Sequence, residues 1–312
     1  MMKIVFLDAK TLGDDISLRC FKGFGEIEVY QTTLPNEVVD RIKDADVIVT
    51  NKVVIDKSVM INAKRLKCIC VAATGMNNID LDAAKELNID VKNVKAYSTN
   101  SVIQHTFAML FYLLEQLRYY DDYVKSLKWS ESSLFTSLDR KFWEINGKNW
   151  GIIGLGTIGK GVAKIALAFG ANIFYYSTSK KNKNSNYPHL DLDELLQKSH
   201  IISIHAPLTK ETENLITKRE LELMKDRAIL LNLGRGKIIN EEDLAQVIDK
   251  KEIYVGLDVL EKEPPSKDNP LLHIKYKDRL LITPHIAWTS KEAREKLIEG
   301  ICNNIKEFLE KR

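Results

Sequence analysis

The sequence lacks the features that mark several classes of protein. No stretch of the 312 residues approaches the roughly 20 consecutive apolar residues of a membrane span. The first ten residues hold a short apolar run, residues 4–7, without the longer apolar core or the cleavage site of a signal peptide. Forty-six basic against 43 acidic residues leave a net charge of +3, which does not suggest a nucleic-acid-binding surface. We therefore expect a cytoplasmic enzyme or binding protein with neither a nucleic acid nor a membrane as its partner.

Cysteine is also scarce. The four cysteines are Cys20, Cys68, Cys70 and Cys302, and none has the Cys-x-x-Cys spacing of a zinc or redox site. Cys68 and Cys70 alternate along a run that is typical of a buried strand. The sequence therefore predicts reduced structural thiols and no metal site.

Two series of alternating strands and helices fill the chain, whose length favours two domains. The strand-like runs of the first series are residues 4–7, 27–30, 47–50, 68–73 and 91–94. A helix is predicted over residues 101–117, and the second series follows at residues 150–155, 172–176, 201–205, 228–233, 253–258 and 280–283. This alternation predicts an α/β protein with two doubly wound parallel sheets, of which the second is a complete Rossmann sheet.

The order of the second set of strands decides which residues become neighbours. With the usual order 3-2-1-4-5-6, the last three strands lie together beside the nicotinamide half of a dinucleotide. Residues that follow these three strands are then close in space. His205 ends the third strand, so this order places it on the adenosine side and makes it a weaker catalytic candidate.

A glycine-rich turn follows the first strand of the second series. Gly154, Gly156 and Gly159 have the spacing G-x-G-x-x-G, and Thr157 and Ile158 begin a helical pattern that continues with Val162, Ile165 and Phe169. The three glycines suit a tight turn, close approach to a pyrophosphate and close packing of helix on strand, respectively. Glycine-rich turns also occur for packing alone, but the strand before and the helix after favour a dinucleotide site.

The acidic residue expected about 20 positions later, to bind the adenosine ribose, is absent. Ser177 and Thr178 stand there, followed by Lys180 and Lys181. This turn carries no charge that would repel a 2′-phosphate, and its hydroxyl and ammonium groups could bind one. A neutral residue can also accept NAD, and exposed lysines are usually only solvated, so NAD and NADP both remain open as the cofactor.

Four candidate residues follow the last three strands. Arg235 lies between two glycines and suits the binding of a carboxylate or the polarisation of a carbonyl. Asp258 could accept a hydrogen bond from the nicotinamide carboxamide, and His285 could exchange a proton with a substrate hydroxyl. Glu263 could orient that imidazole and favour its protonated form, although Glu261 competes by composition. An arginine or glutamate in a surface ion pair is the ordinary alternative.

His105 lies in the apolar helix and is interpreted as a packing or satisfied core group.

Together these residues resemble the D-isomer-specific 2-hydroxyacid dehydrogenases over nearly the whole chain. The matching motifs are the glycine turn and residues 205–208, 232–236, 258–264 and 283–285. The resemblance implies that Arg235, Glu263 and His285 are catalytic and that Asp258 contacts the nicotinamide. It also implies further cofactor contacts at Pro207, Leu233, Gly234, His285 and Ala287.

The first half of the chain extends this resemblance. Residues 73–80 match the substrate loop of the family, so Thr74, Gly75 and Met76 are expected to hold the substrate carboxylate. With residues 97–105 and 285–288, this loop looks most like the glycerate dehydrogenase (hydroxypyruvate reductase) branch. The family implies a flavodoxin-like substrate domain, residues 1–98 and 289–312, and an NAD(P)-binding domain, residues 99–288. It also implies a homodimer formed through residues 101–117 and the following loop.

The expected reaction is reduction of a small 2-oxo acid, with hydroxypyruvate or glyoxylate favoured. The nicotinamide delivers hydride to the carbonyl carbon, His285 donates the proton and Arg235 stabilises the developing charge. Two alternatives stay open: a nicotinamide-sensing regulatory protein of the same fold, and 3-phosphoglycerate dehydrogenase. A phosphorylated substrate requires further cationic groups near the substrate loop, where Lys52 is the candidate.

Overall fold

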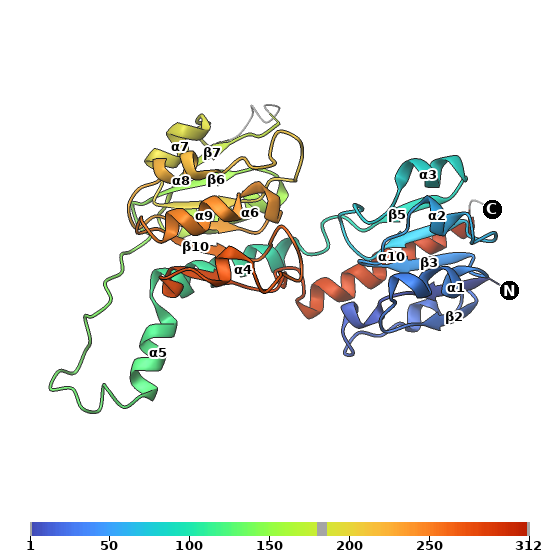
Figure 1. Cartoon of the computed structure of the whole chain (residues 1–312), viewed down its shortest axis with the longest axis horizontal. Helices are drawn as coiled ribbons and strands as arrows, with labels where there is room; N and C mark the ends of the chain where they lie inside the picture. The colour runs from blue at the N-terminus through green and yellow to red at the C-terminus, as the bar shows by residue number, and fades with distance from the viewer. Residues whose placement is uncertain (1, 180–185, 311–312) are drawn as a thin grey trace. The chain divides into compact units, whose positions relative to one another are not determined.

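The computed structural model describes residues 2–179 and 186–310. The chain divides into two compact units (Figure 1). Unit 1 comprises Met1–Ser98 and Trp288–Arg312, and unit 2 comprises Thr99–Ala287. Within the described ranges, no helix combines the length and the apolar character needed to cross a bilayer.

Unit 1 is built on a five-stranded parallel sheet in the order β2-β1-β3-β4-β5, which is the flavodoxin-like order. The strands are β1 Lys3–Phe6, β2 Glu26–Val29, β3 Val47–Thr50, β4 Cys68–Val71 and β5 Asp90–Asn93. Every residue of β3 and β4 is buried, as expected for parallel strands covered on both faces.

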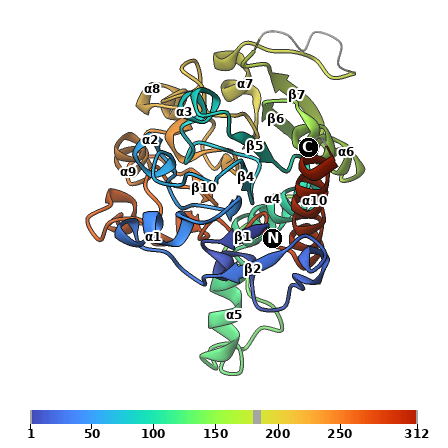
Figure 2. The same ribbon diagram turned by 90° about the vertical axis from the view of Figure 1, so that its right-hand side faces the viewer.

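Helices cover both faces of this sheet (Figure 2). One face packs against α1 Val38–Ile42, α2 Lys57–Met60 and α3 Leu81–Glu86. The other packs against α10 Lys291–Glu310, whose Leu297, Ile301 and Ile305 are fully buried. Cys68 and Cys70 point to this second face, and all four cysteines are free thiols. Short 3-10 helices η1 Ala9–Leu12, η2 Arg19–Phe21 and η3 Pro35–Glu37 connect the elements.

Unit 2 is built on a six-stranded parallel sheet. Its strands are β6 Asn149–Ile153, β7 Asn172–Tyr176, β8 Ile201–Ile204, β9 Ile229–Asn232, β10 Tyr254–Leu257 and β11 Leu280–Ile282. One face packs against α4 Thr99–Leu114 and α6 Thr157–Ala168. The other packs against α7 Leu192–Lys198, α8 Lys218–Leu223 and α9 Glu241–Ile248. The unit also contains the 3-10 helices η4 Gly236–Ile238, η5 Pro270–Leu272 and η6 Lys277–Arg279. The predicted fold class, two doubly wound parallel sheets, is confirmed.

The order assumed for the strands of the second sheet is wrong. The observed order is β11-β10-β9-β8-β6-β7, so the third strand of the series, β8, lies between β6 and β9. The place beyond β7 is taken by a single bridge between Tyr175 and His189. His205, which follows β8, therefore does not lie on the adenosine side. The strands β9, β10 and β11 are adjacent, as expected.

The apolar pattern of α6 also differs in detail from the prediction. Val162 is fully buried, whereas Ile165 and Phe169 are 39% and 45% exposed. The buried positions are Gly159, Val162, Ala163 and Ala166, which are small enough to let the helix approach the sheet closely. Phe169 instead stacks on Phe107 of α4, with ring centroids 5.9 Å apart.

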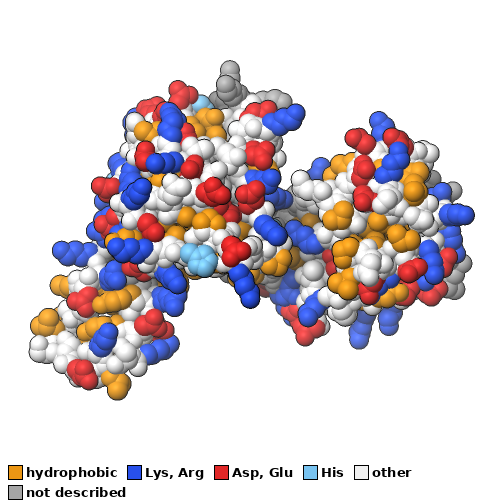
Figure 3. Space-filling model, in the orientation of Figure 1, with side chains coloured by type: hydrophobic (Ala, Val, Ile, Leu, Met, Phe, Trp, Pro, Cys, Tyr) orange, Lys and Arg blue, Asp and Glu red, His pale blue; other side chains and the backbone are white. Residues whose placement is uncertain are grey.

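An arm projects from unit 2 (Figure 1). It consists of α5 Leu117–Lys125 and the irregular segment 126–142. Figure 3 shows apolar side chains scattered over its surface. The most exposed are Leu127, Leu134, Phe135 and Leu138, of which Phe135 is 90% exposed.

Candidate active site

In the turn between β6 and α6, each of the three positions requires glycine for a different reason. Gly154 has a φ of +92°, and a side chain there would lie 2.8 Å from the Ala206 nitrogen. A side chain at Gly159 would lie 2.4 Å from the Gly154 carbonyl oxygen. Gly156, by contrast, faces open space, with no other atom within 4 Å of an added Cβ. A turn that is tightly packed on two sides and open on the third fits a pyrophosphate above Gly156.

The start of α6 adds to this fit. Its N-cap is Gly156, which has no side chain to accept hydrogen bonds from the first turn, and the first turn carries no acidic residue. The N–H groups and the positive end of the helix dipole therefore suit an anion.

The end of β7 holds Ser177 in place of the expected acid. Its side chain is 3% exposed, and its hydroxyl has no hydrogen-bond partner among the described residues. A buried hydroxyl without a partner is unfavourable, so a ribose hydroxyl or phosphate oxygen of a cofactor would stabilise it. Lys180 and Lys181, whose ammonium groups could bind the 2′-phosphate of NADP, lie outside the described residues.

The remaining predicted cofactor residues occupy the same edge of the sheet. Pro207 follows β8, and its carbonyl accepts a hydrogen bond from the Thr212 hydroxyl at 2.7 Å. The others differ in exposure: Leu233 and Gly234 are buried, Ile158 and Thr178 are half-buried, and Thr157 is exposed.

Arg235 lies in a turn that the Asn232 side chain stabilises with two hydrogen bonds. The Asn232 side chain accepts a hydrogen bond from Gly234 N–H at 3.0 Å and donates one to the Arg235 carbonyl at 2.9 Å. A side chain at Gly236 would lie 2.0 Å from the carbonyl carbon of Leu260. Glycine therefore allows the Arg235 turn to contact the segment that follows β10. The Arg235 guanidinium donates to the Gly234 carbonyl at 2.8 Å.

Glu263 and His285 form a pair. The Nδ1 atom of His285 lies 2.6 Å from Oε2 of Glu263, and Leu260 N–H donates to Oε1 of the same carboxylate at 3.0 Å. Glu261 is placed elsewhere, 3.7 Å from the Lys237 ammonium at the surface. The structure thus brings Glu263, and not Glu261, to the histidine.

The backbone at His285 is in the left-handed region, with a φ of +54°. This conformation costs about 1–3 kcal/mol for a residue other than glycine, so the surroundings must hold it. Asp258 does so: its Oδ1 accepts from Ile286 N–H and its Oδ2 from Ala287 N–H, both at 2.9 Å. Asp258 is 1% exposed. It anchors the histidine turn, a role that the sequence did not indicate.

His105 and Thr283 extend this anchor. The Thr283 hydroxyl donates to Asp258 Oδ1 at 2.7 Å. His105 Nε2, on α4, lies 3.1 Å from the Thr283 hydroxyl and 3.5 Å from Asp258 Oδ1. Burial lowers the pKa of His105, while the nearby Asp258 carboxylate opposes this shift. The interpretation of His105 as a satisfied group in the helix misses its link to the site. A titratable side chain in an otherwise apolar helix is the signal that could have indicated such a link.

The other histidines are outside this constellation. His205 has both ring nitrogens buried without a partner among the described residues, and burial lowers its pKa to about 3. His200 accepts a hydrogen bond from Asn149 N–H at the amino end of the sheet. His189 forms the bridge to Tyr175, and His273 contacts the Lys267 carbonyl.

In unit 1, the predicted substrate loop follows β4. The Thr74 hydroxyl donates to the Val94 carbonyl at 3.0 Å, and the Asn93 amide donates to the Thr74 carbonyl at 2.6 Å. These bonds fix the loop, including Gly75 and Met76, against the end of β5.

Lys52 follows the neighbouring strand β3, and its side chain is free to extend because the residue is exposed. Asp8 accepts a hydrogen bond from Lys52 N–H at 2.7 Å.

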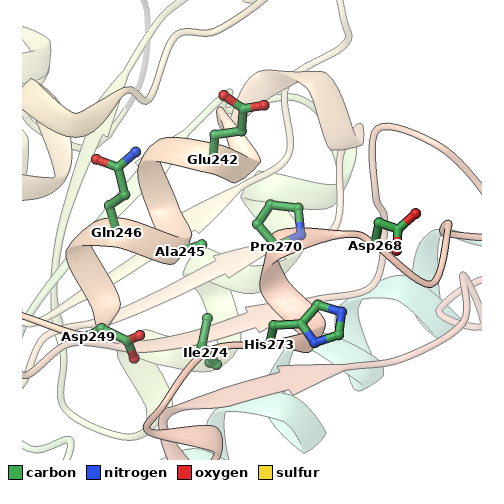
Figure 4. A pocket seen from close by; sticks show the side chains of 8 residues that line it. All are labelled: Glu242, Ala245, Gln246, Asp249, Asp268, Pro270, His273 and Ile274. Carbon is green, nitrogen blue, oxygen red and sulfur yellow. The ribbon is translucent and has the colours of Figure 1, made fainter.

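A hollow of about 460 Å³ lies elsewhere on unit 2, beside α9 and η5 (Figure 4). Its lining includes the carboxylates of Glu242, Asp249 and Asp268, together with His273. Three carboxylates disfavour an anionic substrate, and none of the candidate catalytic residues lines the hollow. The described part of the chain also holds no cluster of three or more His, Cys, Asp or Glu residues suited to a metal ion.

A dinucleotide-binding sheet with an arginine and a histidine–glutamate pair after its last three strands defines a class: the NAD(P)-dependent oxidoreductases. Comparison with known proteins agrees. Residues 107–287 match the D-isomer specific 2-hydroxyacid dehydrogenase, NAD binding domain. The hydroxypyruvate reductase of Blautia hydrogenotrophica is 38% identical over 315 residues, which cover 99% of this chain and 97% of that protein.

Two solved structures resemble the whole chain. One is an acyclic imino acid reductase in complex with NADPH and D-Arg, with a TM-score of 0.87, 31% identity and coverage of 99% of this chain and 98% of that chain. The other is D-lactate dehydrogenase from Aquifex aeolicus complexed with NAD and lactic acid, with a TM-score of 0.84, 30% identity and coverage of 99% and 96%, respectively. The chain belongs to the D-isomer specific 2-hydroxyacid dehydrogenase family. It is an NAD(P)-dependent oxidoreductase that acts on the CH–OH group of donors, which confirms the predicted family and enzyme class.

Proposed function

We propose that the protein reduces hydroxypyruvate or glyoxylate to the corresponding 2-hydroxy acid. The observation that carries this proposal is the pairing of His285 with Glu263 at 2.6 Å, next to the Arg235 turn. The hydroxypyruvate reductase of Blautia hydrogenotrophica, similar over nearly its full length, supports the choice of substrate.

In the proposed reaction each catalytic residue has one task. The cofactor, when bound, supplies a hydride to the substrate carbonyl carbon. His285 donates a proton to the carbonyl oxygen as it becomes a hydroxyl, and Glu263 stabilises the positive charge that His285 carries before the transfer. Arg235 stabilises the negative charge that develops on the same oxygen.

Substrate and cofactor are assigned to different units. Unit 1, with Trp288–Arg312, is the proposed substrate-binding domain, and the amides of residues 74–76 bind the substrate carboxylate. Unit 2 is the proposed NAD(P)-binding domain, with Gly156 below the pyrophosphate and Ser177 beside the adenosine ribose. Asp258 is proposed to accept a hydrogen bond from the nicotinamide carboxamide in addition to its anchoring bonds.

The choice between NAD and NADP depends on Ser177. A neutral hydroxyl there accommodates either the ribose hydroxyl of NAD or the phosphate of NADP. The two solved structures described above contain one cofactor each: NADPH in the imino acid reductase and NAD in the lactate dehydrogenase. Both cofactors therefore belong in the test.

We propose that a homodimer forms through residues 101–117 and the following loop, which belongs to the arm of unit 2. Large apolar side chains such as Phe135, 90% exposed, are unfavourable in water and become buried when a second copy covers them. The four free cysteines fit a reducing compartment, and we propose the cytoplasm.

Initial rates with hydroxypyruvate, glyoxylate, pyruvate and 3-phosphohydroxypyruvate, each with NADH and NADPH, test the proposal. We expect the highest kcat/KM with one of the first two substrates. Preference for 3-phosphohydroxypyruvate would instead identify a 3-phosphoglycerate dehydrogenase, with Lys52 as a phosphate ligand. Cofactor binding without turnover of any of the four would favour a regulatory, nicotinamide-sensing protein.

A further inference from the structure

We propose that His105 is a positioning residue that, with Thr283, fixes Asp258 so that Asp258 can hold His285 in its left-handed turn. The inference rests on the proposed function only in taking His285 as the proton donor. The residues concerned belong to three different elements of unit 2: His105 to α4, Asp258 to the end of β10, and Thr283 and His285 to the segment after β11.

Asp258 ties down the chain on both sides of His285. Before the histidine, the Thr283 hydroxyl donates to Asp258 Oδ1 at 2.7 Å. After it, the N–H groups of Ile286 and Ala287 donate to the two carboxylate oxygens, each at 2.9 Å. His285 is thus the apex of a loop whose two ends are bonded to one buried carboxylate. A shift of that carboxylate moves both ends of the loop, and with them the imidazole.

The direction of the hydrogen bonds follows from counting protons. The Thr283 hydroxyl has a single proton, which it donates to Asp258 because an ionised carboxylate can only accept. In the contact with His105, the Thr283 oxygen must therefore be the acceptor, and His105 Nε2 must carry a hydrogen. His105 is consequently the end of a chain of donors that runs from Nε2–H to the Thr283 hydroxyl and on to Asp258.

This arrangement differs from that of a histidine that serves only packing. The His105 side chain is 19% exposed, yet its Nε2 lies within 3.5 Å of both the threonine oxygen and the carboxylate. Burial lowers the pKa of His105, although the Asp258 carboxylate opposes this shift. The hydrogen on Nε2 that the Thr283 contact requires can be carried by the neutral ring as well as by the charged one. The same helix contacts the loop once more, through the Ser101 hydroxyl, which donates to the Ala287 carbonyl at 2.6 Å. Helix α4 therefore supports the loop on both sides of His285.

The test uses substitutions that separate the hydrogen bond from the volume of the side chain. His105→Leu removes the N–H donor, whereas His105→Gln retains an N–H donor at a similar reach. Thr283→Val and Thr283→Ser form a second pair of the same kind. His200→Leu is the matched control, since His200 is also partly buried but lies at the amino end of the sheet.

We expect His105→Leu and Thr283→Val each to lower kcat about tenfold, because small displacements of a catalytic group have large effects on rate. The KM for NADH should change less than kcat does, because Asp258 is only one of the proposed cofactor contacts. His105→Gln and Thr283→Ser should retain most of the wild-type kcat. The double variant His105→Leu/Thr283→Val should have a kcat only slightly lower than that of either single variant. Wild-type kcat in both His105→Leu and Thr283→Val overturns the proposal, as does a His105→Gln variant that is as impaired as His105→Leu.

A second readout does not depend on turnover. In protein labelled with [13Cε1]histidine, the His285 signal is identified by its loss in the His285→Ala variant. We expect this signal to move in His105→Leu and Thr283→Val, and to stay in place in His105→Gln and His200→Leu. An unmoved signal in the two loss variants contradicts the positioning role. If the wild-type protein reduces no 2-oxo acid, the proposed function fails, and this spectrum alone still decides the role of His105.

Discussion

Nδ1 of His285 lies 2.6 Å from Oε2 of Glu263, so this ring nitrogen is committed to the carboxylate. In the proposed reaction the other ring nitrogen, Nε2, faces the substrate. The other carboxylate oxygen accepts from Leu260 N–H, which fixes the orientation of Glu263. In the proposed reaction, this pair supplies the transferred proton from His285, and Glu263 stabilises the protonated ring, as in other histidine–carboxylate pairs.

Glu263→Gln should therefore lower kcat by about 100-fold, since general acid catalysis by a paired histidine contributes at least that much. The amide can still reach the ring but no longer stabilises its positive charge. Glu261→Gln is the control, because Glu261 contacts Lys237 at the surface and not His285. Steady-state rates for the two variants check the prediction, and equal rates would contradict it.

Gly156→Ala should leave the fold intact and weaken cofactor binding. An added methyl group at Gly156 meets no atom within 4 Å, but it occupies the space in which we place the pyrophosphate. We expect the dissociation constant for NADH to rise at least about tenfold, equivalent to about 1.4 kcal/mol, with an unchanged melting temperature.

Gly154→Ala is the contrasting variant, because Gly154 has a φ of +92° and lies against the Ala206 backbone. It should lose about 1–3 kcal/mol of unfolding free energy. Titration calorimetry and thermal unfolding distinguish the two effects. Tight NADH binding by Gly156→Ala would place the pyrophosphate elsewhere.

The strands and the residues that follow them could be predicted from sequence because each strand is a short apolar run that ends at glycine, proline or a polar residue. The order of the second sheet could not. The third strand of a Rossmann sheet is reduced here to one bridge, Tyr175 to His189, and a single residue leaves no apolar run to recognise. Because β8 lies between β6 and β9, His205 is not on the adenosine side that the order 3-2-1-4-5-6 predicts.

The hydrogen-bond networks between side chains could not be predicted from the sequence either. Arg235 and His285 are indicated by residue type and by their place after a strand, whereas Glu263 is distinguished from Glu261 only by the resemblance to the family. His105 and Thr283 are 178 positions apart, and a titratable side chain in an apolar helix does not by itself indicate which residue it contacts. Only the packing of α4 against the carboxyl ends of β10 and β11 brings them together.

His205 should make the stability of the protein depend on pH. Burial lowers its pKa to about 3, below the value of 6.5 that applies when the chain is unfolded. Between these values the unfolded chain binds a proton that the folded protein does not, so stability is lost as pH falls from about 6.5 toward 3. The contribution is about 1.4 kcal/mol per pH unit for one proton.

We expect His205→Leu to show a smaller decrease in unfolding free energy between pH 6 and pH 4 than the wild-type protein, measured by urea denaturation without cofactor. His273→Leu, at an exposed position, serves as the control. If the unfolding free energies of wild type and His205→Leu depend on pH in the same way, the pKa of His205 is not lowered in the folded protein.

Phe135→Asp should convert a dimer into a monomer. Phe135 is 90% exposed on the arm, and a charge there opposes burial against a second copy. Val54→Asp, at a 61% exposed apolar position of unit 1, is the control and should remain dimeric. Light scattering after size exclusion gives the mass of each. A monomeric wild-type protein would remove the proposed role of the arm.

The most direct test of the account is the comparison of wild type with His285→Ala in the reduction of hydroxypyruvate and glyoxylate, with the affinity for NADH and NADPH measured in parallel. We predict turnover by the wild-type protein and a loss of about 100-fold to 10,000-fold in kcat for His285→Ala. For each cofactor, the affinities of the two proteins should agree within twofold. Wild-type turnover by His285→Ala would contradict the assignment of His285 as the proton donor.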